Sequence, residues 1–252
     1  MKREAALPSS ASSRQATGHP LQDPRADPKD HIIRTHGRDA AGDLAFVALN
    51  LGLWAADAAL FRPYWAPGPR ALPNVRALLA FDLVRACRHC FWKLQIGTGI
   101  FTAPTAAFVA LFNFATATAK LWLAARAGPG VPPEVMRAVL GLATAVFAAG
   151  SAIETGSELQ RRAFKATAPG GLYTGGLFGA ARNINYGGYV LWRLGMSLAT
   201  CSPWALFFPA WHAWDFGARA VPMLEKYMQA RYQGQWERYK EATPYRIFPG
   251  VW

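Results

Sequence analysis

Residues 99–125 read GIFTAPTAAFVALFNFATATAKLWLAA, an apolar run long enough to cross a bilayer as one helix. A second such run starts near Glu134 and continues into the 150s, rich in small residues that let helix backbones approach closely. Further apolar segments cover about 44–61, 75–94, 186–200 and 204–221. These runs predict an all-α fold, a polytopic transmembrane helical bundle of about six spans.

The composition supports a membrane protein. Hydrophobic residues make up 52% of the chain and charged residues 17%, against the roughly 25% charged that soluble domains carry. The net charge is +12, but the basic residues are scattered singly at the ends of apolar runs. Nucleic-acid binding would need a basic stripe interleaved with stacking aromatic residues, so we expect a membrane and no nucleic acid as partner.

Prolines separate the first two segments, and charged residues lie within the second. Asp43 is expected to cap the first helix, and the Pro-rich stretch 63–73 excludes a regular helix after it. The second segment, 75–94, carries several charged residues. Two placements therefore stay open for it, a tilted span packed within the bundle or a helix in the membrane interface.

Basic residues indicate the orientation. They concentrate between the fourth and fifth segments and in the C-terminal tail, which the positive-inside rule places in the cytoplasm. An even number of spans puts the N-terminus there as well. The amphipathic stretch 225–241 is then expected to be a cytoplasmic C-terminal helix. Arg62 and Arg70 fall on the opposite side, in mild conflict with the rule.

We divide the chain into three parts. Residues 1–40 are rich in Ser, Pro and charged residues and contain no apolar core segment, so we expect a disordered tail. Residues 41–153 are the N-terminal transmembrane helices, and residues 154–252 form a C-terminal domain. Cys87 and Cys90 form one C-x-x-C without a second pair, so no metal site is expected.

The C-terminal domain contains three polar clusters, and polar side chains are costly among apolar helices. The first lies within 154–165, the second is the run RNINYGGY at 182–189, and the third lies within 219–246. Together they supply cations for phosphates, aromatic planes for stacking, and Asn or Glu for ribose or base edges. This set of groups suits a phosphate-bearing nucleotide cofactor, since Arg binds phosphate well.

The same clusters carry a family resemblance. Residues 182–188 (RNINYGG), the spacing of Glu225 and Tyr232, and the ending PYRIFP at 244–249 are similar to the C-terminal domain shared by DUF1295 proteins, steroid 5α-reductases and sterol reductases. Isoprenylcysteine carboxyl methyltransferases are more distant relatives. The chain most resembles uncharacterised fungal members of DUF1295. The resemblance covers about the last hundred residues well, and the first half only as a hydropathy profile.

The resemblance implies a cytoplasm-facing NADPH site with an unsaturated lipid entering from the bilayer. The cofactor-binding positions it implies are Arg161, Lys165, Tyr173, Phe178, Arg182, Asn185, Tyr186, Glu225, Arg231, Tyr232, Tyr239 and Arg246. Asn183 and Ile184 stand where the family has His and Pro, and Tyr189 stands at a position that is often acidic. Two proton-handling groups are therefore missing, and Tyr189 and Glu158 are the remaining catalytic candidates.

The expected function is that of a NADPH-dependent reductase, which reduces a C=C bond in a steroid, sterol, enoyl or terpenoid lipid. The expected localisation is integral to the membrane, in the endoplasmic reticulum. Two alternatives stay open: a membrane methyltransferase that uses S-adenosylmethionine, and a family member that has lost catalysis. The lipid and the oligomeric state stay open as well.

Overall fold

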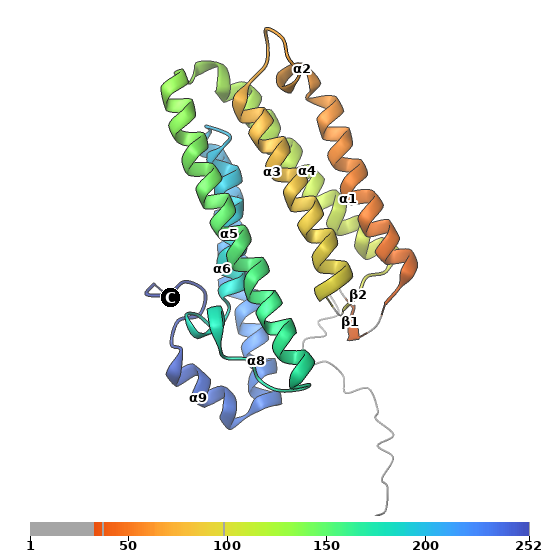
Figure 1. The fold of residues 1–252 in the computed structure, drawn as a ribbon, viewed down its shortest axis with the longest axis vertical. Helices are drawn as coiled ribbons and strands as arrows, with labels where there is room; N and C mark the ends of the chain where they lie inside the picture. Colours follow the sequence, from red (N-terminus) through yellow and green to blue (C-terminus); the bar gives the residue numbers. More distant parts are fainter. Residues whose placement is uncertain (1–32, 37, 98, 252) are drawn as a thin grey trace, which may run out of the picture.

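The protein is a bundle of long helices whose directions alternate along the chain (Figure 1). The computed structural model describes residues 33–36, 38–97 and 99–251, so the predicted disordered tail falls almost entirely outside the described residues. The helices are α1 (Ala40–Leu60), α2 (Arg62–Trp65), α3 (Pro73–Phe91), α4 (Ala103–Ala127), α5 (Pro133–Thr167), α6 (Ile184–Leu198), α7 (Phe207–Asp215), α8 (Val221–Tyr232) and α9 (Gly234–Ala242). This architecture confirms the predicted all-α class.

Shorter elements join the long helices. The chain is wound as a π-helix over Trp92–Ile96 and Phe216–Ala220, and as a 3-10 helix over Gly128–Gly130, Gly176–Gly179 and Pro203–Leu206. The strands β1 (Ile33–His36) and β2 (Gly99–Ile100) form one short antiparallel pair. This pair is a small addition to a helical fold.

Among the described residues, three helices are long and apolar enough to cross a membrane: Ala40–Leu60, Ala103–Gly130 and Pro133–Thr167. They support a helical membrane bundle. Helix α6 has 15 residues, about 22 Å at 1.5 Å per residue, which is short of the roughly 30 Å hydrocarbon core. Three of the predicted six spans therefore meet the length and hydropathy requirements by themselves, and α3, α6 and the α7–α8 run complete the bundle.

The start of α1 differs from the prediction. Asp39, not Asp43, is the N-cap, and its carboxylate accepts hydrogen bonds from the amides of Ala41 and Gly42 at 3.0 and 3.2 Å. Asp43 lies one turn inside the helix and forms an ion pair with Lys93, which is buried. A buried ammonium needs a carboxylate partner, so Asp43 pairs with Lys93 and does not cap the helix.

The charges of the second segment point into the bundle. Arg85 binds both carboxylate oxygens of Asp82, at 2.6 and 3.1 Å, and also the amide oxygen of Asn50 on α1 at 3.1 Å. Arg88 donates to Ser151 and pairs with Glu154, both on α5. Helix α3 therefore lies between α1 and α5, which favours the packed-in-bundle placement over the interfacial one.

Helices α5 and α6 touch through glycine. A Cβ at Gly188 would lie 2.5 Å from the backbone nitrogen of Glu154, and one at Gly195 would lie 2.6 Å from that of Phe147. Gly150 on α5 meets α6 in the same way, since its Cβ would lie 2.3 Å from the backbone nitrogen of Trp192. Small residues at such contacts let backbones approach, and this contact sets the positions of the polar side chains at one end of the pair.

The C-terminal helix predicted over 225–241 is wrong as a single element. The helix begins earlier, because α7, the π-helix and α8 form one continuous run from residue 207 to 232. It then breaks at Gln233, whose φ is 46°, before α9 begins. Helix α9 and the start of α1 lie at the same end of the bundle, the lower end in Figure 1.

Candidate functional site

The polar half of α5 forms one wall of the candidate site. Glu158 is 4% exposed. Its carboxylate forms an ion pair with Arg161 and accepts a hydrogen bond from the amide of Asn185 on α6 at 2.9 Å. Arg161 also lies over the ring of Phe178 at 5.4 Å. The structure thus brings together Glu158, Arg161, Phe178 and Asn185.

Lys165 fixes the loop after α5. Its ammonium donates to the carbonyl of Gly171 and to the hydroxyl of Tyr232 on α8, the latter at 3.0 Å. The Tyr232 hydroxyl also donates to Gly171, at 3.3 Å. Lys165 and Tyr232 are therefore neighbours, and both hold the Gly-rich loop against α8.

Tyr239 on α9 binds the same loop after α5 at a second point. Its hydroxyl donates to the carbonyl of Phe178 at 2.7 Å, and burial raises the pKa of Tyr239 above its ordinary value. Tyr173 packs edge-on against Phe178, with ring centroids 5.8 Å apart. A hollow of about 380 Å³ lies beside Tyr239, between Leu172 of the loop and Arg238 of α9. Its lining is mainly polar, with Thr174, Gln235, Arg238 and Thr243 around the phenol of Tyr239.

Arg182 joins three segments of the C-terminal domain. Its guanidinium donates to the carbonyls of Thr243 and Pro244 at 2.6 and 2.9 Å, and to the carboxylate of Glu225 at 3.0 Å. Arg246 pairs with the same carboxylate at 3.5 Å. Both arginines thus share one glutamate, and Arg182 serves the fold as well as the predicted site.

Asn183, which stands where the family has His, has a structural role in this protein. Its backbone amide and side-chain amide both donate to the carbonyl of Arg246, at 2.8 and 3.1 Å. The residue is 2% exposed. Asn183 therefore anchors the C-terminal segment, and proton transfer is not a role that a bonded amide can fill.

Tyr186 and Tyr189 face α7 and the π-helix. Tyr186 stacks on Phe216 with ring centroids 4.5 Å apart. The ring of Tyr189 meets Phe216 at 5.2 Å and His212 at 5.3 Å. Its hydroxyl accepts a hydrogen bond from Arg193. Glu158 and Tyr189, the two catalytic candidates, thus have different neighbours. Glu158 contacts Arg161 and Asn185, whereas Tyr189 contacts Arg193, His212 and Phe216.

The structure adds a buried polar group that the sequence reasoning missed. Arg193 is 1% exposed, donates to Asn113 at 3.2 Å, and its Nε has no hydrogen-bond partner in the described part of the chain. Lys120 is also 1% exposed, donates to the carbonyl of Thr116 at 3.1 Å and lies over Phe208 at 4.7 Å. Within residues 38–97 and 99–251, neither cation has a carboxylate within ion-pair distance. Charges inside apolar segments are the signal that would have found them.

The remaining predicted residue lies outside the cluster. Arg231 is exposed on α8, donates to the hydroxyl of Tyr227, and lies 5.5 Å from the ring of Tyr232. The described residues contain no group of three side chains that could hold a metal ion. Cys87 is exposed and Cys90 is buried, both as free thiols.

Fold and site together define a polytopic helical membrane protein with a polar cluster at one end of the bundle. The family described as "Protein of unknown function (DUF1295)" matches residues 102–243, and the chain belongs to this family. The chain is also similar to "Probable O-methyltransferase ustE" of Ustilaginoidea virens, with 31% identity over 170 residues. That match covers 64% of this chain and 60% of the relative, so the chain spans less than two thirds of the relative's length.

Proposed function

We propose that the protein is a membrane methyltransferase that uses S-adenosylmethionine and methylates an oxygen atom of a lipid-soluble acceptor. The observation that carries this proposal is that carboxylates engage the arginines of the cluster. Arg161 is paired with Glu158, and Arg182 and Arg246 share Glu225. The name of the fungal relative supports the same reaction class.

These ion pairs favour S-adenosylmethionine over NADPH. The phosphates of NADPH carry several negative charges and call for several cations that are free to form charged hydrogen bonds, whereas here carboxylates engage Arg161, Arg182 and Arg246. S-adenosylmethionine carries a sulfonium, an ammonium and a carboxylate in one molecule. A carboxylate, a guanidinium, an amide and aromatic rings match this mixture, since aromatic faces attract cations.

We assign the cofactor end of the site to α5, the start of α6 and the following loop. S-adenosylmethionine supplies, when bound, a methyl group on a positively charged sulfur. Glu158 attracts the positive groups, and Asn185 keeps its carboxylate oriented through their 2.9 Å hydrogen bond. Arg161 is partly exposed, and the part of its guanidinium that does not contact Glu158 binds the single carboxylate of the cofactor. Phe178 and Tyr239 form the apolar wall that excludes water.

We assign the acceptor end to Tyr189, Arg193 and His212. The Nδ1 atom of His212 lies 2.7 Å from the carbonyl of Phe208, so Nδ1 carries the proton and Nε2 is the basic nitrogen. In this assignment Nε2 accepts a hydrogen bond from the acceptor hydroxyl and takes its proton as the oxygen is methylated. The nearby charge of Arg193 stabilises the negative charge that develops on that oxygen, an effect that is strong in a buried site.

The second candidate is the reductase predicted from the sequence. The PYRIFP ending at 244–249, which is similar to that of sterol reductases, and the cations Arg161 and Lys165 favour it. In this case Arg161 and Lys165 bind phosphates of NADPH, and Tyr189 donates a proton.

Titration of the purified protein with each cofactor, followed by tryptophan fluorescence, separates the candidates. We expect S-adenosylmethionine to bind, and Glu158→Gln to weaken it about tenfold, the effect of one charged hydrogen bond. Glu237→Gln on the exposed surface of α9 is the matched control and leaves affinity unchanged. Binding of NADPH alone supports the reductase and refutes the methyltransferase, and binding of neither supports loss of catalysis.

The acceptor end is tested separately, by methyl transfer from labelled S-adenosylmethionine to extracted membrane lipids. We expect His212→Gln to abolish transfer and to leave cofactor affinity unchanged. Transfer at the wild-type rate in this variant contradicts the role of His212 but not the cofactor assignment.

A further inference from the structure

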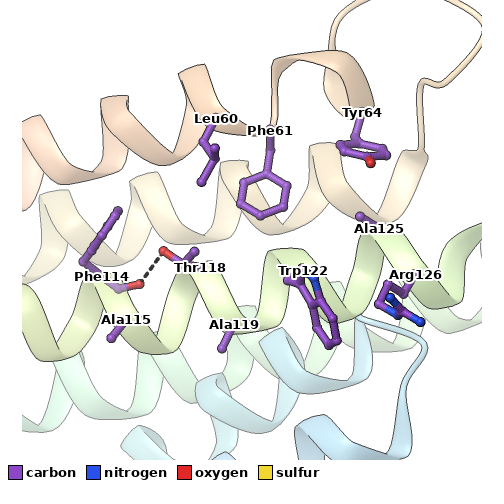
Figure 2. Close-up of a pocket in the computed structure, with 10 residues that line it drawn as sticks. All are labelled: Leu60, Phe61, Tyr64, Phe114, Ala115, Thr118, Ala119, Trp122, Ala125 and Arg126. Atoms are coloured by element: carbon purple, nitrogen blue, oxygen red, sulfur yellow. Dashed lines mark hydrogen bonds between the residues drawn. The ribbon is translucent and has the colours of Figure 1, made fainter.

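A large hollow lies at the end of the bundle opposite α9. It has a volume of about 800 Å³ and lies between the end of α1, the short helix α2 and the second half of α4. Figure 2 shows Leu60, Phe61 and Tyr64 on one side, facing α4 on the other. Its volume falls in the range of roughly 300–1,000 Å³ that suits a small ligand.

The lining suits a hydrocarbon chain. Most of the side chains around the hollow are apolar. Along α4 the lining runs from Phe114 to Arg126, about 18 Å at 1.5 Å per residue. This length is close to one leaflet of the roughly 30 Å hydrocarbon core. One acyl chain of a bilayer lipid therefore matches the hollow in both chemistry and length.

One end of the hollow is positively charged. Arg126 is exposed, lies next to the last residue of α4, and contacts the ring of Trp122 at 4.8 Å. The connections at this end, residues 61–73 and 127–133, contain Arg62 and Arg70 and no Asp or Glu, and the start of α5 adds Glu134 and Arg137, one charge of each sign. The carboxylate of Asp57 is 1% exposed and accepts a hydrogen bond from Thr118, so it does not face this end.

We propose that this hollow binds one anionic glycerophospholipid, with an acyl chain along α4 and its phosphate at Arg126. Guanidinium binds phosphate through paired hydrogen bonds, and Trp at the interface is a common neighbour of lipid headgroups. The proposal also explains why Arg62 and Arg70 depart from the positive-inside rule, since an anionic headgroup offsets their charge. The site is separate from Glu158 and Tyr239, at the other end of the bundle, and does not depend on the proposed reaction.

Native mass spectrometry of the full chain, released from detergent after addition of phosphatidylglycerol or phosphatidylcholine with identical chains, tests the site. Ala115→Trp fills the hollow, and Arg126→Gln removes the headgroup contact. Ala148→Trp and Arg137→Gln, both at exposed positions on α5, are the matched controls. Melting temperatures of all four variants establish that each is folded.

We expect phosphatidylglycerol to bind with a clear preference over phosphatidylcholine. Arg126→Gln should lower that preference about tenfold, the factor of one charged hydrogen bond, and Ala115→Trp should abolish the bound lipid. The controls should behave as the wild type. Equal binding of the two lipids, lost in Ala115→Trp, overturns the anionic assignment in favour of a neutral apolar ligand. Unchanged binding in Ala115→Trp overturns the site itself.

Discussion

Replacing Gly188 by alanine should separate the two helices that carry the candidate site. A Cβ there would lie 2.5 Å from the nitrogen of Glu154 and 2.8 Å from the carbonyl oxygen of Gly150. Ordinary contact begins near 3.4 Å, so α5 and α6 must part by about 0.9 Å. Both opposing atoms are backbone, and no change of rotamer can relieve the clash.

The magnitude follows from two opposing effects. Overpacking costs about 1–3 kcal/mol, and a clash between backbones belongs at the upper end of that range. Alanine in place of glycine within a helix raises the free energy of unfolding by about 1 kcal/mol. We therefore expect Gly188→Ala to lower the free energy of unfolding by about 2 kcal/mol.

The matched control is Gly141→Ala on α5, where a Cβ would have no atom within 4 Å. It should raise the free energy of unfolding by about 0.5–1 kcal/mol. Unfolding in mixed detergent, followed by tryptophan fluorescence, reports on both variants because Trp192 is buried at the α5–α6 contact. A Gly188→Ala protein as stable as Gly141→Ala would refute the reasoning. Cofactor affinity should fall in parallel, since parting the helices lengthens the 2.9 Å bond between Asn185 and Glu158.

Three further predictions concern the C-terminal domain. Arg182→Lys loses the forked contacts to the carbonyls of Thr243 and Pro244 and should cost about 2 kcal/mol; hydrogen exchange should then speed up over 243–247, and unchanged exchange contradicts this. Tyr239 has a raised pKa in the folded protein, so its stabilising effect is complete below about pH 10 and is lost as pH rises from there. The melting temperature should therefore fall above pH 10 in the wild type and fall less in Tyr239→Phe. The same pH dependence of the melting temperature in both proteins argues against this role. Gln233→Gly should raise the melting temperature by relieving a φ of 46°, worth about 1 kcal/mol, and a lower melting temperature would contradict the strain.

Much of the fold was predictable because the apolar segments are long and separated by proline or glycine. The cap of α1 was not, since Asp39 and Asp43 are both suited to that position and only the partner of Asp43, the buried Lys93, decides between them. The break at Gln233 comes directly before Gly234, and α9 then follows with Trp236 and Tyr239 buried. One glycine next to the break was too weak a signal to place it from the sequence.

The candidate site was predictable in part for a similar reason. The contact of Glu158 with Asn185 joins two polar clusters that the sequence had already singled out. The group around Arg193 was harder to predict, because Asn113, Lys120 and His212 come from segments that look purely apolar, and only the packing of α4, α6 and α7 brings them together. Periodicity shows which face of one helix is apolar, but it does not show which other helix packs against that face.

The contacts of Arg182 have a consequence for the order of assembly during synthesis. The acceptors of its guanidinium, Thr243 and Pro244, follow it by 61 and 62 residues. While the ribosome is still making α7 to α9, the start of α6 carries a cation without its permanent acceptors. The polar end of the α5–α6 pair therefore cannot mature helix by helix as each one enters the bilayer. It is completed only when residues 243 and 244 have been made and have packed against the start of α6.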